Sequence, residues 1–305
     1  MGLRILIVFP RDGETDQALV DACRSRGHEV DSICARRESA GMFQRLIDHR
    51  GKIDLVLMSR TEELYFDFVS SRDRYPHIKF AIWNVDVRQS LEEWGLLVNF
   101  VREVDYYFTV ALGVVDRWTA VNPNTFYVPQ GIQIERYHDT TPTEESVEKY
   151  LCDVSFIGNV IDNVHLGRQS LIETLKRSHY DFRHFTGIYG EEHNQAVACS
   201  KINLAVTHSP DIPYYVSVRD WKIIAARGIL LEQWHEGLDD MFGGNVTLYD
   251  SETDCLNKIS EILGDYKTYE KKAFELWEWA MDTQTYAHRI DQIVGILEGD
   301  KSCSQ

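Results

Sequence analysis

The chain has 305 residues, of which 44% are hydrophobic and 26% charged, so it carries enough apolar material for two folded domains. Its formal net charge of -16 disfavours nucleic acid as the main partner, because phosphate backbones are bound by clustered Lys and Arg. The 6 cysteines are scattered without a CxxC pair, which argues against a zinc ribbon or a disulfide framework, and no apolar run approaches the ~18 residues of a membrane span. These features predict a cytoplasmic protein with reduced thiols and no membrane span.

The first half of the chain alternates apolar strands with amphipathic helices. Residues 3–9 and 29–34 predict two strands on either side of a helix over 15–26. The pattern then predicts a helix at 43–49 and strands at 53–58, 79–83, 106–110 and 125–128. Continuous apolar strands separated by helices are typical of a parallel sheet covered on both faces. Residues 1–140 are therefore predicted to form a Rossmann-like domain.

A second α/β domain is predicted after a polar stretch. Residues 137–149 are rich in Thr, Glu and Asp, and this composition predicts an exposed linker. The alternation then resumes, with strands expected at 153–158, 182–187, 202–207, 228–231 and 246–249, and helices at 166–178 and 269–297. Residues 150–298 are assigned to this second Rossmann-like domain.

Several catalytic motifs are missing from the sequence. The first strand is followed by Pro10-Arg11-Asp12-Gly13, without the GxGxxG glycines that let a backbone approach a pyrophosphate, so NAD binding there is disfavoured. The sequence also lacks a Walker A motif, a GxSxG elbow and an HExxH pair. The pair Asp239-Asp240 is interpreted as a surface loop, so no metal site is predicted.

Glycines and polar residues gather where the strands of the second half are expected to end. These ends carry Gly158-Asn159, Gly187 to Gly190, Thr207-His208 and Glu232-Gln233. Open α/β sheets bind ligands at this edge, and glycine lets a backbone come close to the ligand. Arg168 and Arg219 lie near the starts of predicted helices and could face a negative group there. Each of these arginines, taken alone, is equally consistent with an ordinary surface charge.

The segment from Ser200 to Glu232 is the most informative part of the chain. It predicts a strand, a loop, a helix with small residues near its end, and an apolar strand that ends at Glu232. Ala225 and Ala226 would let the helix pack closely, and Gly228 suits the left-handed position that follows a helix.

With these residues, the second half resembles the nucleotide-sugar domain of GT-B glycosyltransferases, in particular the CgeB-like spore maturation proteins and the family-4-like branch. The similar segments are Phe156-x-Gly158-Asn159 with a following Arg168, Tyr189-Gly190, Ser200 to Leu204, Arg219 to Gly228, and Thr285-Tyr286-x-x-Arg289. Trp83 to Asp86 and Asp105 to Thr109 match the first half of the family more loosely. The resemblance implies an α/β fold of two Rossmann-like domains facing across a cleft, with C-terminal helices returning toward the N-terminal domain.

The resemblance also implies a function and a site. A sugar would pass from a nucleotide-diphosphate donor to an unidentified acceptor (a glycan, a protein or a small molecule) without a metal or other cofactor. The implied donor-binding residues are Gly158, Asn159, Arg168, Tyr189, Gly190, Lys201, His208, Arg219 and Asp220. Asp12 and Asp86 follow strands of the first half and are candidates for the catalytic base, although a turn or helix-cap role fits each of them equally well.

One position departs from the family pattern. Lys222 stands where the family has an acidic residue that accepts hydrogen bonds from the nucleotide ribose. Either Asp220 takes this role or the donor contact differs. Two alternatives therefore stay open: a non-catalytic nucleotide- or glycan-binding homologue, and a sugar-nucleotide epimerase of the same fold.

Overall fold

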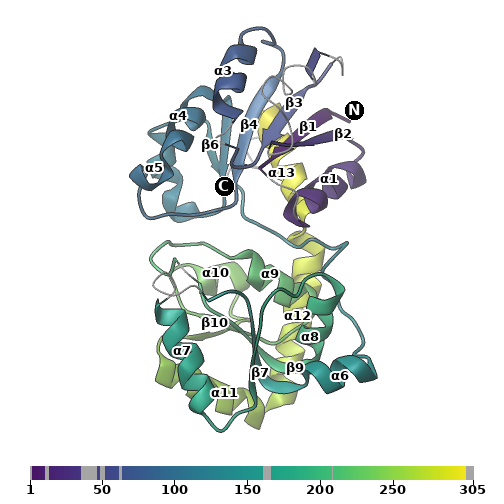
Figure 1. Cartoon of the computed structure of the whole chain (residues 1–305), viewed down its shortest axis with the longest axis vertical. Helices are drawn as coiled ribbons and strands as arrows, with labels where there is room; N and C mark the ends of the chain where they lie inside the picture. Colours follow the sequence, from purple (N-terminus) through teal and green to yellow (C-terminus); the bar gives the residue numbers. More distant parts are fainter. Residues whose placement is uncertain are drawn as a thin grey trace. The chain divides into compact units, whose positions relative to one another are not determined.

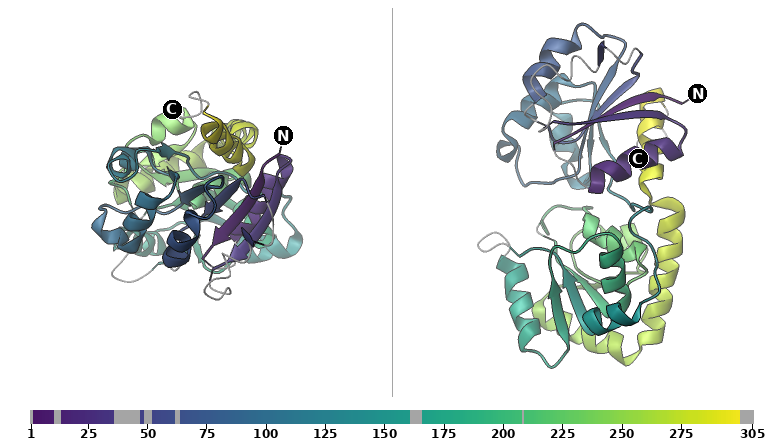
Figure 2. Two further views of the ribbon diagram at one scale, coloured as in Figure 1. Left: turned by 90° about the horizontal axis from the view of Figure 1, so that it is seen from above. Right: turned by 45° about the vertical axis from the view of Figure 1, so that its right-hand side comes forward.

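The computed structural model describes residues 2–10, 14–35, 47–48, 52–61, 64–160, 166–207 and 209–299. The chain divides into two compact units, unit 1 (Met1–Gln130 with Tyr286–Gln305) and unit 2 (Gly131–Thr285) (Figure 1). Each unit is built around one parallel sheet with helices on both faces (Figure 2). Among the described residues, no helix combines the length and the apolar character needed to cross a membrane.

Unit 1 contains a six-stranded parallel sheet in the order β2-β1-β3-β4-β5-β6. Its strands are β1 (Arg4–Phe9), β2 (Glu29–Cys34), β3 (Leu55–Met58), β4 (Lys79–Asn84), β5 (Tyr106–Thr109) and β6 (Thr125–Tyr127). Its helices are α1 (Glu14–Ser25), α3 (Tyr65–Arg72), η2 (Glu92–Trp94), α4 (Leu96–Glu103), η3 (Leu112–Val114), α5 (Val115–Thr119) and α13 (Tyr286–Glu298). Strand β3 is buried along its whole length because helices cover both faces of the sheet. The predicted helix at 43–49 falls mostly outside the described residues.

Unit 2 contains a five-stranded parallel sheet in the order β11-β10-β9-β7-β8. Its strands are β7 (Cys152–Ile157), β8 (Phe182–Phe185), β9 (Ser200–Ala205), β10 (Leu230–Gln233) and β11 (Thr247–Tyr249). Its helices are α6 (Glu144–Tyr150), α7 (Leu166–Arg177), α8 (Glu191–Cys199), α9 (Val218–Ala225), α10 (Leu238–Phe242), α11 (Glu252–Gly264) and α12 (Tyr266–Thr283). One apolar core joins the sheet to α8, α9 and α10, and a second joins it to α7 and α11.

The second part of the predicted linker is helical. Helix α6 occupies residues 144–150, and its first turn is closed by a capping box in which Thr143 and Ser146 each accept a hydrogen bond from the other's backbone N–H. Tyr137, also inside the predicted linker, is fully buried. Most of residues 137–149 are exposed, as predicted, but the stretch lies inside unit 2 and does not link the two units. Its helix was not predicted, because Thr and Glu at a helix start have the same composition as a loop.

The last helix belongs to unit 1, whereas the sequence pattern assigned residues up to 298 to the second domain. Helix α13 packs against α1, and the ion pair between Arg26 Nη2 and Asp291 Oδ2 measures 2.8 Å. The buried Arg289 donates from Nε to the carbonyl of Gln130 at 3.1 Å. Rings of Trp83 and Tyr286 lie 5.4 Å apart. These contacts complete the core of unit 1 with residues from the far end of the sequence.

The turn after α9 differs from the expected geometry. Arg227, and not Gly228, adopts the left-handed conformation, with φ at 57°. Gly228 serves close packing, since a Cβ at this position would lie 2.5 Å from Cγ1 of Val197. The glycine thus lets α9 and the start of β10 approach α8.

Candidate functional site

A cavity of about 180 Å³ opens in unit 2 at the carboxyl ends of β7 and β8, beside the start of α9. It is lined by Ile157, Gly158, Asn159, Gly187, Ile188, Tyr189, His193, Val218, Arg219 and Lys222. This is the edge at which open α/β sheets bind ligands. The described residues of this lining include two cations, Arg219 and Lys222, and no carboxylate.

Arg219 is held in place by the end of the sheet. Its Nε donates to the carbonyl of Ile157 at 2.9 Å and its Nη1 to that of Val206 at 3.3 Å. The guanidinium carbon lies 5.0 Å from the ring centroid of Phe156. A Cβ on Gly158 would lie 2.5 Å from Nη2 of Arg219, so the backbone and the arginine share this space only because residue 158 is glycine.

Arg168 lies beneath the cavity, with 6% of its surface exposed. Its Nη1 donates to the carbonyl of Asn159 and its Nη2 to that of Val206, both at 2.8 Å. Burial, together with the neighbouring charge of Arg219, lowers the pKa of Arg168 to about 10. Arg168 therefore fixes the backbone that forms the cavity wall.

A buried carboxyl pair lies behind Arg219. Asp220 and Glu232 are each 1% exposed, and Oδ2 of Asp220 accepts from the backbone N–H of Ser217 at 2.8 Å, which caps α9. Burial raises the pKa of both carboxyl groups, and the charge of Asp220 raises that of Glu232 further. Asp220 does not line the cavity, so the geometry assigns it to helix capping and gives no support to the ribose role proposed from the sequence.

The buried Glu232 is expected to make stability depend on pH. Below its ordinary value near 4.5, the carboxyl is protonated in both the folded and the unfolded chain. At higher pH the unfolded chain releases this proton while the folded chain retains it, so stability falls as pH rises toward the raised pKa. Glu232→Gln keeps the shape of the side chain and a polar end without an ionisable proton. We expect the free energy of unfolding, measured with denaturant from about pH 5 to about pH 8, to fall less steeply with pH in this variant than in the wild type.

The exposed Glu236 provides the matched control. Glu236→Gln should leave the pH dependence of unfolding as in the wild type. Equal slopes for wild type and Glu232→Gln would contradict a protonated carboxyl at position 232.

Lys222 occupies the other half of the cavity, between two tyrosines. Its Nζ lies 4.4 Å from the ring centroid of Tyr137 and 5.6 Å from that of Tyr189. Tyr189 is 56% exposed and leads into α8 through Gly190, whose φ of 55° favours glycine. Burial, with the charges of Lys222 and Arg219, lowers the pKa of His193 to about 3. His193 is thus a neutral ring in the wall of a positively charged cavity.

The structure brings together four of the nine residues predicted for the donor site. Gly158, Asn159, Tyr189 and Arg219 line the cavity, and Gly190 follows Tyr189. Sequence reasoning missed Tyr137 and His193 and did not count Lys222 as a site residue. The sequence could have indicated Lys222 as a site residue. Residues three apart on a helix share a face, and Lys222 follows Arg219 at that spacing.

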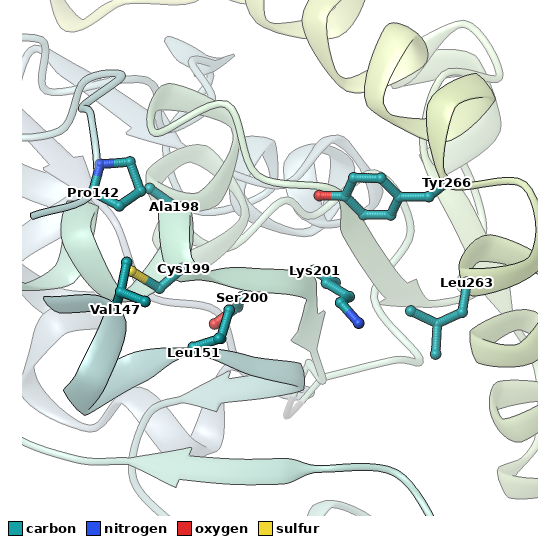
Figure 3. A pocket seen from close by; sticks show the side chains of 9 residues that line it. All are labelled: Pro142, Val147, Leu151, Ala198, Cys199, Ser200, Lys201, Leu263 and Tyr266. Atoms are coloured by element: carbon teal, nitrogen blue, oxygen red, sulfur yellow. The ribbon is translucent and has the colours of Figure 1, made fainter. Parts of the chain in front are cut away.

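Lys201 lies at the opposite edge of the sheet. It is at the amino end of β9, where its Nζ forms an ion pair of 2.8 Å with Oδ1 of Asp153. A strand rises ~3.3 Å per residue, so the ligand-binding end of β9 at Ala205 is ~13 Å away. Figure 3 shows Lys201 beside a separate cavity of about 500 Å³, with apolar side chains such as Leu151 and Leu263. The structure therefore removes Lys201 from the candidate site.

Three further candidates remain. Asp12 and His208 lie outside the described residues. Asp86 follows β4 in unit 1, where its Oδ2 pairs with Nη1 of Arg60 at 3.0 Å. Within the described part of the chain, no three His, Cys, Asp or Glu side chains are grouped closely enough to hold a metal ion.

Comparison with protein families connects this cavity to a known class of enzyme. Residues 161–295 match a family model described as glycosyl transferase-like. This segment includes α7, α9 and seven of the ten residues that line the cavity. The match covers 135 of the 305 residues, so this segment is similar to a glycosyl transferase-like domain. No curated protein sequence matches the chain.

Solved structures extend the likeness to the whole chain. Anabaena HepE in complex with UDP-glucose is 11% identical, with a TM-score of 0.69 and coverage of 97% of this chain and 99% of that one. Sucrose-phosphate synthase from Thermosynechococcus elongatus is 10% identical, with a TM-score of 0.71 and the same coverage of 97% and 99%. T4 phage BGT in complex with UDP and Mn²⁺ is 10% identical, with a TM-score of 0.57 and coverage of 95% and 97%.

These identities establish the fold, which is that of GT-B glycosyltransferases, with two Rossmann-like domains. The predictions of this fold and of a glycosyltransferase are confirmed by the family match and the structural neighbours together.

Proposed function

We propose that the protein transfers a sugar from a nucleotide-diphosphate donor, held in the cavity of unit 2, to an acceptor hydroxyl. In this reaction the bond between the sugar carbon and the diphosphate oxygen breaks, and the electron pair leaves with the diphosphate. The acceptor oxygen forms the new bond and releases its proton to a base. The observation that carries the proposal is the cavity at the end of β7, where Gly158 gives backbone access beside Arg219 and Lys222.

The departing diphosphate gains negative charge, and this charge needs stabilisation. Arg219 and Lys222 line the cavity from α9, and Val218, the first residue of this helix, lines it as well. We propose that these groups supply the positive charge without a resident metal. Asp86, at the carboxyl edge of the sheet of unit 1, is kept as the candidate base.

Three further details are proposed on narrower grounds. HepE was solved both with UDP-glucose and with UDP and glucose, which makes UDP-sugars the first donors to test. The segments Phe156 to Asn159 and Arg219 to Gly228 support membership of the CgeB-like branch. The described cysteines are free thiols, which supports a reducing compartment such as the cytoplasm.

The test is a thermal-shift panel of UDP-, GDP-, dTDP-, ADP- and CDP-sugars, followed by an assay for released nucleoside diphosphate with candidate acceptors. We expect one nucleotide to raise the melting temperature, since a ligand that binds only the folded state stabilises it by mass action. Turnover in the presence of EDTA is expected to match turnover without it. The absence of a shift with every nucleotide would contradict the proposal.

Lys222 favours a second function, because it stands where the family that the sequence resembles has an acidic residue. A non-catalytic homologue would bind nucleotide or glycan without releasing nucleoside diphosphate. Release that depends on both donor and acceptor would eliminate this alternative.

A further inference from the structure

The ring of His193 lies in the wall of the cavity without a hydrogen bond. His193 belongs to the first turn of α8, lines the cavity and is only 3% exposed. Within the described part of the chain, neither nitrogen of its ring has a hydrogen-bond partner. Buried polar groups of folded proteins nearly always have such a partner, so its absence calls for an explanation. Because the ring borders a cavity, a ligand that enters the cavity can supply the missing partner.

The surroundings of His193 keep its ring uncharged and fix its plane. Burial, followed by the charges of Lys222 and Arg219, lowers the pKa of His193 to about 3, so the imidazole is neutral at physiological pH. The ring of Tyr137 packs against it with the centroids 5.2 Å apart and the planes at 82°. A neutral imidazole carries one proton, and its second nitrogen can only accept a hydrogen bond.

Burial distinguishes the two nitrogens of this ring. Nδ1 of His193 is fully buried, whereas Nε2 keeps some exposed surface. A buried N–H group without an acceptor is rarer in proteins than a buried acceptor without a donor. The bare lone pair is therefore expected on Nδ1 and the proton on Nε2. In this tautomer, His193 presents an uncharged N–H group at the surface of the cavity.

We propose that His193 is a donor-binding residue whose Nε2–H donates a hydrogen bond to an oxygen of the nucleotide sugar. The acceptor is an oxygen of the nucleoside, of the diphosphate or of the sugar, and it completes a ring that the described residues leave without a partner. An uncharged donor recognises the position of an oxygen, whereas Arg219 recognises negative charge. This inference rests on the proposed function, because it takes the nucleotide sugar to lie in this cavity.

NMR of the protein labelled with ¹⁵N-histidine tests the tautomer without any ligand. A ring nitrogen that carries a proton and one that does not have well-separated chemical shifts. The signals that disappear in His193→Gln identify His193 among the 11 histidines of the chain. We expect a bare Nδ1 and a protonated Nε2 at neutral pH. A proton on Nδ1 would overturn the inference, whether or not a nucleotide binds.

Calorimetric titration with uridine, UMP, UDP and UDP-glucose then locates the acceptor oxygen. His193→Phe keeps an aromatic ring in the wall and removes the N–H group. We expect this variant to bind about two- to tenfold more weakly when the acceptor is uncharged, and about ten- to a hundredfold more weakly when it is a phosphate oxygen. The smallest ligand that shows the loss identifies the acceptor as part of the nucleoside, the phosphates or the sugar. For another nucleotide selected by the thermal-shift panel, the corresponding four ligands are used.

Three variants separate the N–H group from the packing of the ring. The amide of glutamine can reach the place of Nε2, whereas the shorter asparagine reaches only the place of Nδ1. His193→Gln should therefore bind the nucleotide more tightly than His193→Phe does, while His193→Asn should bind as weakly as His193→Phe. His77→Phe removes an exposed imidazole of unit 1 and should leave every affinity as in the wild type.

The failures of this inference and of the proposed function differ. Equal affinities of the wild type and His193→Phe for all four ligands would overturn the inference and leave the proposed function standing. Equal losses in His193→Gln and His193→Asn would do the same, because the ring would then act through its packing. Failure of every nucleotide to bind the wild type would overturn both.

Discussion

Arg219→Ala is expected to abolish the rise in melting temperature that a nucleoside diphosphate gives the wild-type protein. The guanidinium is pre-positioned by its bonds to Ile157 and Val206 and by the ring of Phe156, so little conformational entropy is lost when it binds phosphate. Loss of this group should weaken binding about a hundredfold, as expected for one or two charge-assisted hydrogen bonds. Titration calorimetry measures the change directly.

Two variants control this experiment. Arg219→Lys retains the charge without the planar fork and should bind nucleotide with intermediate affinity. Arg177→Ala removes an exposed arginine near the end of α7 and should behave as the wild type. A folded Arg219→Ala protein with an undiminished thermal shift would place the diphosphate elsewhere.

Arg168→Met is expected to lower the free energy of unfolding by about 3–5 kcal/mol, because two hydrogen bonds from a charged group are lost and each contributes roughly 1.5–3 kcal/mol. The substitution leaves the carbonyls of Asn159 and Val206 without their donors. It also removes a cation that faces the carboxyl group of Glu232. Because methionine fills a similar volume, the decrease in the free energy of unfolding comes mainly from the lost polar contacts and only slightly from a new cavity.

A double-mutant cycle separates these contributions. In the Glu232→Gln background the carboxyl group is gone, so Arg168→Met should cost less than it does in the wild type. Denaturant unfolding, followed by fluorescence and by circular dichroism to detect separate transitions of the two units, gives the four free energies. Additive costs would show that Arg168 and Glu232 act independently.

Much of the fold could be predicted from the sequence because buried parallel strands have a strong pattern. The apolar runs that became β1, β3 and β7 are bounded by polar residues or glycine, and their order with the helices sets the sheet type. Open α/β sheets bind ligands at the carboxyl ends of their strands, and this alone predicts that Gly158 and Tyr189 belong to one site.

The errors have physical causes. Lys201 and the site residues occur within one stretch of similar sequence, but a strand carries its two ends to opposite edges of the sheet. Tyr137 reaches Lys222 across many intervening residues, and such a contact leaves no trace in local periodicity. The polar residues before α6 were interpreted as a linker because caps and loops use the same amino acids.

The position of α13 has a consequence for synthesis of the chain. Unit 1 is assembled from both ends of the sequence, while unit 2 is one continuous stretch from Gly131 to Thr285. On the ribosome, the first sheet emerges early but lacks the helix that packs against α1 and carries the buried Arg289. Unit 2 can therefore close first, although it is translated second, and the apolar surface of the earlier unit stays uncovered until residues 286–298 appear.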